Sequence, residues 1–266
     1  MSRSDARPRF RPRLRFELPL APGPDETLDA IGEGEVRLLQ RKAGYRFNLD
    51  AVLLADFAMR PRGGSRRLSV IDLGTGCGVI ALLLKSRRPV WSVAALELQP
   101  SLADLARRNA ELNGLDLRVV EGDLRAPPPD LGRDFDLVVA NPPFFAAGGG
   151  HRSPDDEKAI ARQEWSATAD DLARATKRLL KSNGAFCVVY PAGRLPHLFS
   201  ALAKHGLTPT GLRAVHPRFD APAGVVLVEA RPESKRPLAV GPPLVVHDAD
   251  GPFGSEVATM LSRRAG

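Results

Sequence analysis

The sequence predicts an α/β fold with a seven-stranded, mostly parallel sheet, helices on both faces and an antiparallel C-terminal strand. The first observation is that short apolar runs, typical of buried strands, alternate with segments of helical periodicity from residue 66 onward. The second is that four runs deliver a polar residue at or near their ends, at intervals that suit strand–helix–strand units. These residues are Asp72, Glu97, Asp123 and Asn141, spaced by 25, 26 and 18 positions.

The patterning sets the expected elements in order. Strands are expected at 68–73, 91–96, 117–120, 134–140, 185–190, 207–215 and 224–230, and the last two form an antiparallel pair. Helices are expected at 49–57, 79–87, 100–113, 169–180 and 194–205, with Asn48 as the N-cap of the first. Ahead of them, 36–40 and 45–47 are expected to pair as a hairpin around the turn 41–44.

A single domain is expected from residue 28 to 266. It divides into an N-terminal hairpin and helix (28–60), a Rossmann-like core (66–232) and a C-terminal strand and helix (236–266). Residues 1–27 are expected to form a disordered basic arm, because the first 15 residues carry six arginines, interleaved prolines and a single Asp. Such an arm either suits a polyanionic partner or is only a solubilising tail.

Composition narrows the class of protein. Hydrophobic residues make up 43% and charged residues 26% of the chain, as in ordinary globular proteins. No apolar run reaches 18 residues and the N-terminus lacks an apolar signal-peptide core, which favours a cytoplasmic protein without membrane contact. Cys77 and Cys187 fall in apolar segments and are expected to be reduced core residues. The five histidines show no metal-ligand spacing, so no metal site is expected.

The stretch Asn141-Pro142-Pro143-Phe144, after the fourth expected strand, predicts the reactive part of the protein. Two prolines exclude regular structure and leave an Asn side chain and carbonyl oxygens as hydrogen-bond acceptors. If Asn141 and the Pro142 carbonyl accept both hydrogens of an exocyclic amine, the nitrogen lone pair can point at an electrophilic methyl group. Phe144 would stack on the base that carries the amine. The alternative is an ordinary Asn-Pro turn that closes a strand.

A glycine-rich turn, Gly74-Thr75-Gly76-Cys77-Gly78, joins the first core strand to its helix. Glycines there let the backbone approach a ligand at the N-terminus of the helix, although the spacing differs from that of a pyrophosphate site. Because parallel strands end at one edge of the sheet, Glu97 can accept from ribose hydroxyls and Asp123 from an adenine amine. Asp50, in the first turn of its helix, either is only stabilised by the helix dipole or faces the amino group of the cofactor.

Together, these residues resemble class I S-adenosylmethionine-dependent methyltransferases in the glycine turn, Glu97 and Asp123. Asn141–Phe144 resembles the catalytic motif of enzymes that methylate planar exocyclic amines or amides. The segments 45–55, 161–164, 243–247, 251–253 and 256–257 are similar to bacterial tRNA(Val) adenine-37 N6-methyltransferases, and the resemblance runs from about residue 33 to 262. Gln163 departs from the aromatic residue or His of that family.

The resemblance implies S-adenosyl-L-methionine as cofactor, tRNA as partner and direct, in-line methyl transfer to adenine without a metal, by a protein expected to be a monomer. The implied catalytic residues are Asn141, Pro142, Pro143 and Phe144. The implied cofactor-binding residues are Asp50, Asp72, Gly74, Thr75, Gly76, Gly78, Glu97, Asp123, Leu124 and Asn141. The implied substrate-binding residues are Tyr45, Phe47, Arg152, Arg162 and Arg218.

Four other functions fit part of the pattern. A methyltransferase of a protein glutamine amide would use the same Asn-Pro-Pro-Phe motif, because that amide is also a planar nitrogen with two hydrogens. A DNA adenine methyltransferase would use it too, but no sequence-reading domain is evident. An NAD-dependent dehydrogenase shares the acidic residue after the second strand but needs a different glycine spacing. A non-catalytic module of the same fold leaves the motif without a purpose.

Overall fold

The computed structural model describes residues 21–32, 34–43, 46–60, 66–142, 167–248 and 253–262. Five residues of the expected site lie outside these ranges, namely Tyr45, Pro143, Phe144, Arg152 and Arg162. The first 20 residues of the expected basic arm lie outside them as well. Glu26 and Thr27 were also expected in that arm, but they belong to a strand, so the C-terminal boundary expected for the arm is wrong.

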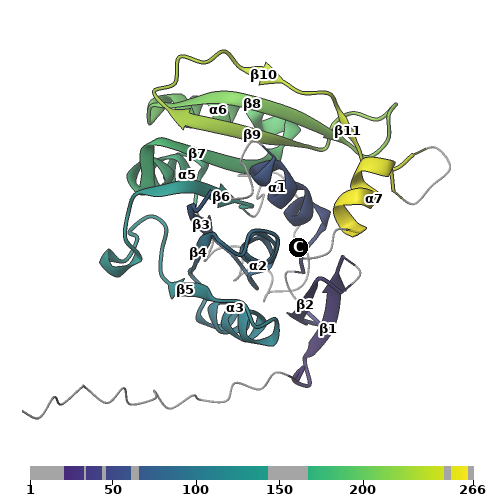
Figure 1. Ribbon diagram of the computed structural model, residues 1–266. Coiled ribbons are helices and arrows are strands. Elements are labelled where there is room, and N and C mark those ends of the chain that lie inside the picture. Colours follow the sequence, from purple (N-terminus) through teal and green to yellow (C-terminus); the bar gives the residue numbers. More distant parts are fainter. Residues whose placement is uncertain are drawn as a thin grey trace, which may run out of the picture.

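A mostly parallel sheet forms the centre of the molecule (Figure 1). Its seven long strands lie in the order β5-β4-β3-β6-β7-β9-β8, and only β9 runs against its neighbours. This order confirms the predicted fold class. The strands are β3 (Ser69–Leu73), β4 (Ser92–Glu97), β5 (Leu117–Glu121), β6 (Phe135–Ala140), β7 (Leu180–Pro191), β8 (Leu207–His216) and β9 (Val225–Pro232).

Two short strands that the sequence analysis did not separate extend the sheet to nine. β10 (Ala239–Val240) and β11 (Leu244–Val245) both pair in parallel with β8, at its outer edge. Pro242 and Pro243 lie between them and carry no N–H, which interrupts the ladder and is tolerated at an edge. The segment that was expected to form a single C-terminal strand therefore forms two short strands, each paired with β8.

Helices cover both faces of the sheet. On one face lie α1 (Leu49–Met59), α2 (Val79–Arg87) and α3 (Pro100–Leu112), and on the other α5 (Ala169–Leu179) and α6 (Leu195–Lys204). Alternate strand residues serve the two cores, since Val70 joins the first and Ile71 the second. Cys77 and Cys187 are buried free thiols, as expected. No helix in the described ranges is long and apolar enough to cross a membrane.

The shorter elements complete the chain. The last helix, α7 (Ser255–Ser262), packs beside α1 and β11 (Figure 1). Two 3-10 turns, η1 (Pro129–Leu131) and η2 (Ala192–Arg194), precede β6 and α6. Glu256 of α7 pairs with Arg213 of β8 at 2.6 Å, so this C-terminal helix is tied to the sheet by a charged contact as well as by Val257 and Met260.

The N-terminal hairpin differs from its expected form. β2 (Val36–Arg41) pairs with the preceding β1 (Glu26–Ile31), whereas Phe47 of the expected partner 45–47 lies in no strand. The alternation of β1 was overlooked because three prolines stand just before it. The hairpin packs against α3, where Arg108 pairs with Glu26 at 2.6 Å.

Candidate active site

The glycine turn and the Asn-Pro sequence lie at the same edge of the sheet. In the register, Leu73 of β3 lies opposite Ala140 of β6. Gly74 and Asn141 follow these two residues and leave the sheet beside each other, on strands about 4.8 Å apart. On the other side of β3, β4 ends at Glu97. Carboxyl ends of parallel strands are where ligands bind in open α/β sheets.

The turn itself requires glycine. Gly74, Gly76 and Gly78 all have positive φ, of 70°, 60° and 93°, which side chains with a Cβ rarely adopt. At Gly78 a Cβ would also come within 3.3 Å of Ala106 Cβ on α3, so the helices pack closely there. The backbone N–H of Gly74 donates to the Leu96 carbonyl of β4 at 2.8 Å. The turn is therefore tight and fixed to the neighbouring strand.

Glu97 holds this turn from the side. Its side chain is 1% exposed, and one carboxylate oxygen accepts from the backbone N–H of Gly76 at 2.8 Å. The other oxygen accepts from the backbone N–H of Gln99 at 2.9 Å. A carboxylate offers about four acceptor positions, so these bonds do not exclude the ribose hydroxyls that the sequence analysis assigned to it. Glu97 thus shapes the site in addition to any contact with a ligand.

Asp72 adds a second buried carboxyl group below the turn. Its Oδ2 accepts from the Thr75 hydroxyl at 2.6 Å, while its buried Oδ1 has no hydrogen-bond partner among the described residues. Burial, and to a smaller extent the nearby Glu97 carboxylate, raise the pKa of Asp72 to about 7. Two acidic side chains behind the glycine turn favour a ligand that brings positive charge.

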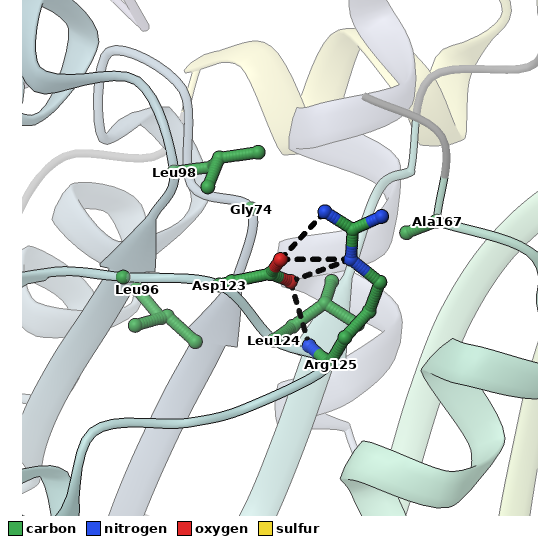
Figure 2. Close-up of a pocket in the computed structure, with 8 residues that line it drawn as sticks. Gly74, Leu96, Leu98, Asp123, Leu124, Arg125 and Ala167 are labelled. Carbon is green, nitrogen blue, oxygen red and sulfur yellow. Dashed lines mark hydrogen bonds and ion pairs between the residues drawn. The ribbon is translucent and has the colours of Figure 1, made fainter. Parts of the chain in front are cut away.

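A pocket opens beside the turn, at the ends of β3, β4 and β5 (Figure 2). Its walls are mostly apolar, and one acidic and one basic side chain also line it. Figure 2 shows the Asp123 and Arg125 side chains in contact with each other, with Ala167 beside the guanidinium. The lining residues are Gly74, Leu96, Leu98, Gly122, Asp123, Leu124, Arg125 and Ala167. Apolar walls with a polar rim suit a planar heterocycle such as adenine.

Arg125 engages the carboxylate that was expected to accept from adenine. Its guanidinium lies 2.6 Å from Asp123 Oδ2 in an ion pair, and its backbone N–H donates to Oδ1 at 2.8 Å. These hydrogen bonds hold the pKa of Asp123 below its usual value. The sequence analysis missed Arg125, because an Arg two positions after an Asp has no distinctive pattern. An adenine amine would have to share Asp123 with Arg125.

Asn109 of α3 is a further residue that the sequence analysis missed. Its buried side-chain amide donates to the Leu39 and Cys77 carbonyls at 3.0 and 2.9 Å and accepts from Leu39 N–H at 2.7 Å. One side chain thus joins the hairpin strand β2 to the glycine turn. An Asn in a helix interior, flanked by Leu105 and Ala106 on the buried face, was the available signal.

The remaining expected residues occupy varied positions. Asp50 is half-buried in the first turn of α1, where burial raises its pKa. Asn48 stands at the N-cap position but donates to Asp50 at 2.7 Å instead of capping the backbone with its side chain, which corrects that expectation. Phe47 packs partly buried against the core. Arg218 is exposed in the connection between β8 and β9.

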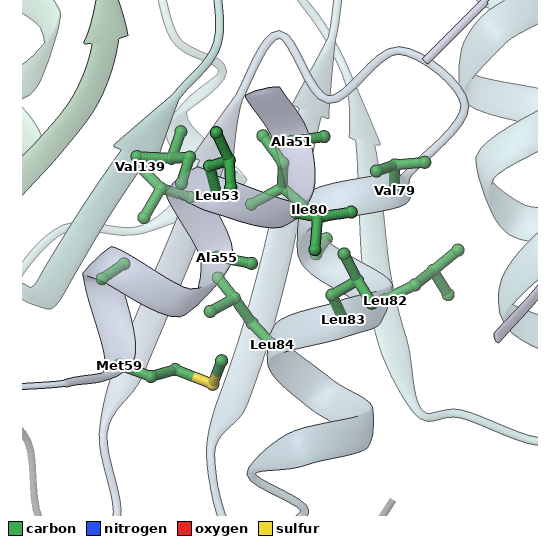
Figure 3. Close-up of a cluster of buried hydrophobic side chains, with 14 of the residues drawn as sticks. Ala51, Leu53, Ala55, Met59, Val79, Ile80, Leu82, Leu83, Leu84 and Val139 are labelled. Carbon is green, nitrogen blue, oxygen red and sulfur yellow. The ribbon is translucent and has the colours of Figure 1, made fainter. Parts of the chain in front are cut away.

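A dense core supports the site from one side. Figure 3 shows α1 packed beside α2 in the core cluster that includes Leu53, Leu83 and Leu84. Each of these three side chains is no more than 1% exposed. Fully burying such a side chain is worth about 1.5–3 kcal/mol, so α2, which begins at the glycine turn, is held firmly against the sheet. A rigid support of this kind is what a precisely shaped ligand site needs.

Comparison with known proteins agrees with this geometry. The methyltransferase small domain family model matches residues 50–197, more than half of the 266 residues. A tRNA1(Val) (adenine(37)-N6)-methyltransferase of Porphyromonas gingivalis is 30% identical over 82% of this chain and 87% of its own length. One from Aeromonas hydrophila is 31% identical over 83% of this chain and 90% of its own.

Solved structures share the fold. A predicted O-methyltransferase from Agrobacterium tumefaciens matches 81% of this chain and 97% of its own with a TM-score of 0.63 at 21% identity. A tRNA (uracil-54, C5)-methyltransferase from Pyrococcus abyssi, solved with S-adenosyl-L-homocysteine, matches 78% of this chain and 45% of its own with a TM-score of 0.52 at 18% identity. On the family model and the two bacterial relatives together, the chain belongs to the methyltransferase small domain family.

Proposed function

We propose that this protein uses S-adenosyl-L-methionine to methylate the exocyclic amine of an adenine in tRNA, near the anticodon. The observation that carries the proposal is the adjacency of Gly74 and Asn141 at one edge of the sheet, which brings a cofactor turn and an acceptor motif together. The relatives named tRNA1(Val) (adenine(37)-N6)-methyltransferase support the substrate class. A tRNA substrate would place the protein in the cytoplasm.

The residues at the edge fit the cofactor. S-adenosyl-L-methionine supplies a methyl group already activated on a sulfonium. The apolar side chains of Leu96, Leu98 and Leu124 offer a surface on which an adenine ring would pack, and Glu97 at the end of β4 would accept from the ribose hydroxyls. The Glu97 carboxylate and, when it is ionised, the Asp72 carboxylate lie behind the turn and would favour a ligand with positive charge. Electrostatic interactions between the cofactor and these fixed polar groups would be stronger in a site from which water is excluded.

Asn141 and Pro142 act on the amine. Their side-chain and backbone carbonyl oxygens accept its two hydrogens, which draws the nitrogen out of conjugation with the ring and aims its lone pair at the methyl carbon. As the nitrogen becomes positively charged, its N–H groups become stronger donors, so these hydrogen bonds tighten in the transition state. No general base would be required before transfer, because the sulfonium C–S bond would break as the N–C bond forms and the methylated amine would lose its extra proton to water afterwards. Positioning and acceptor alignment therefore supply most of the rate acceleration.

A single-stranded adenine suits this edge. An anticodon-loop base is already out of a duplex, so presenting it costs less than flipping a paired base. Arg218 at the same edge is proposed to hold a phosphate of the RNA. Tyr45, Phe144, Arg152 and Arg162 lie outside the described residues and stay predictions.

One incubation tests the proposal. The full-length protein is mixed with methyl-labelled S-adenosyl-L-methionine and bulk tRNA that lacks its modifications, and the labelled nucleoside is identified by digestion and mapping. The expected product is N6-methyladenosine at an anticodon-loop position. Label in a glutamine of added protein instead would establish the rival amide methyltransferase, and no transfer to either would overturn the proposal.

A further inference from the structure

The connection between β8 and β9 presents an aromatic ring to solvent. Among the described residues, six large apolar side chains are exposed, and Phe219 is the most exposed of them at 84%. Four of the six are aliphatic. The two aromatic ones, Phe219 and Phe253, both belong to segments that meet beside β11 and α7. A ring left in water gives no burial energy to folding, so its position needs another explanation.

The connection is held in a fixed shape. The N–H of Ala221 donates to the Arg218 carbonyl at 3.2 Å, which closes a turn with Phe219 at its first central position. His216 Nδ1 donates to the Ala221 carbonyl at 2.7 Å, and the N–H of Gly224 donates to the Val215 carbonyl at 3.0 Å. We call residues 216–224 the Phe219 turn. Because the turn is already ordered, little conformational entropy would be lost when this ring binds a partner.

The C-terminal segment braces the same turn. The N–H of His247 donates to the Pro217 carbonyl at 3.0 Å, and the His247 ring stacks on Phe253 with centroids 5.4 Å apart and planes 17° apart. Phe253 remains 39% exposed. Figure 1 shows this end of β8 and β9 next to β11 and α7. Two phenyl rings and an imidazole therefore share one corner of the molecule.

That corner lies on the reactive edge of the sheet. β8 runs in the same direction as β6, so the turn after β8 and Asn141 after β6 leave the sheet on the same side. Two strands separate β8 from β6, which places the turn three strand spacings, or about 15 Å, along the edge. A chain with an adenine at Asn141 would pass this corner with a neighbouring nucleotide.

Charge and chemistry favour single-stranded RNA as the occupant. Arg218 precedes the ring and Asp220 follows it, so the tip of the turn is close to neutral while the whole chain carries +7. No side-chain hydrogen bond or ion pair joins the Arg218 guanidinium to another of the described residues, which leaves it able to contact a phosphate. An exposed ring next to an arginine is the usual platform for an unpaired base.

We propose that Phe219 stacks on an unpaired base of the substrate RNA that flanks the methylated adenine, with Arg218 on an adjoining phosphate. The proposal rests on the function proposed above and adds the element that binds the flanking nucleotide. Because every base has a π-face, the contact would raise affinity for single-stranded loops without demanding one base at that position.

The test compares substitutions of Phe219 in the full-length protein, with unmodified tRNA as the probe at a fixed salt concentration. Phe219→Ala and Phe219→Leu are expected to raise the Kd and KM for tRNA about tenfold, the equivalent of about 1.4 kcal/mol and within the range for one stacked base. The kcat and the affinity for S-adenosyl-L-methionine should stay within about twofold. Phe219→Tyr should keep wild-type values, because it keeps the ring.

Val240→Ala is the matched control, since Val240 is an exposed apolar side chain, at 68%, on the edge strand β10. It should leave the Kd for tRNA unchanged. Arg218→Ala should reduce the dependence of log Kd on log salt by about one unit. Equal melting temperatures for all variants would show that the turn is still folded.

Each result bears on a different claim. If the wild type methylates tRNA but Phe219→Ala binds it as tightly, or if Phe219→Leu behaves like Phe219→Tyr, the stacking proposal is wrong and the proposed function stands. If the wild type neither binds nor methylates tRNA, both are wrong. If Phe219→Ala weakens methylation of a protein substrate instead, the turn is a protein-docking element.

Discussion

Two halves of one sheet edge are built on opposite principles. Over β3, β4 and β5, Glu97 is 1% exposed and Asp72 fully buried, and each bonds to the glycine turn. Over β6 to β8, the Phe219 turn leaves a ring 84% exposed. The first half is suited to one small ligand held in a rigid pocket. The second is suited to a large partner that would cover the exposed ring.

The difference explains where a substitution should be felt. In the buried half, Asp72 and Glu97 both bond to the glycine turn, so a change there affects both the ligand site and the fold. In the exposed half, a change should alter the encounter with the substrate and leave the fold intact. The predictions below test that division, beginning with the residue at the boundary between the two halves.

The largest effect is expected from Asn141→Ala, which removes an acceptor whose hydrogen bond to the amine tightens in the transition state. Turnover should fall by about 10²–10³-fold, the usual cost of losing one such group. Cofactor affinity, measured by calorimetry, should be unchanged, because Glu97 and the glycine turn remain. A loss of cofactor binding together with turnover would show that Asn141 belongs to the buried half.

Asp72 should make stability depend on pH in the buried half. Its folded pKa of about 7 lies above the unfolded value of 3.8, so between these values the unfolded state releases a proton that the folded state keeps. Stability from this group is therefore constant below about pH 3.8, falls as pH rises toward 7 and is level above it. The total change is on the order of a few kcal/mol.

Asp72→Asn removes that titration. In thermal melts at several pH values, the melting temperature of the variant relative to that of the wild type should rise by several degrees between pH 4 and 8. The comparison uses the change in the difference, because the new amide also adds buried donors. A difference that stays constant across this range would mean that Asp72 is ionised in the folded protein.

Glu97→Gln should weaken both the cofactor site and the fold. The amide keeps one acceptor oxygen, so the N–H of either Gly76 or Gln99 loses its partner, at a cost of about 1–3 kcal/mol. We expect a lower melting temperature and cofactor affinity reduced about tenfold or more. Affinity lost without any change in melting temperature would assign Glu97 to ligand contact alone.

The smallest effect is expected at Glu256, which pairs with Arg213 and Arg60. Hydrogen bonds from Arg213 lower the pKa of Glu256 to about 2, below the unfolded value of 4.5. Its contribution is therefore full above about pH 4.5 and is lost as pH falls toward 2. The side chain is 38% exposed, so solvent screening limits that contribution to about 1 kcal/mol.

Glu256→Gln should accordingly destabilise the protein by about 1 kcal/mol at pH 7 and by less at pH 3, measured by urea unfolding. Glu233→Gln is the control, because its pair with Lys177 is mostly exposed and should contribute nothing measurable. Equal losses for the two variants would show that the buried position of Arg213 adds nothing to its ion pair.

The fold could be predicted from the sequence because its signals are local. Each core strand is an apolar run, and α2 was expected at the residues where it begins and ends, 79–87. The edge at which Gly74 and Asn141 meet follows from right-handed parallel connections alone. Asp72 and Glu97 lie at or next to the ends of β3 and β4, as expected, since a polar residue at the end of a buried strand is conspicuous.

The details that were missed depend on tertiary contacts. Arg125 matters because it pairs with Asp123 in the lining of the pocket, which no spacing rule reports. The sequence did not predict the pairing of β1 with β2, because prolines precede β1 and residues 45–47, after the turn, have a strand-like pattern of their own. Phe219 was passed over because a single Phe in a turn carries no pattern until its exposure is known.

The side-chain amide of Asn109 hydrogen-bonds both Leu39 of the hairpin and Cys77 of the glycine turn. Because these hydrogen bonds couple the turn to the hairpin, a ligand that stabilises the turn should also stabilise the hairpin. Backbone amides near Leu39 should therefore exchange with deuterium more slowly once S-adenosyl-L-methionine is added. The N-terminal strands would then report cofactor occupancy across the molecule without touching the cofactor.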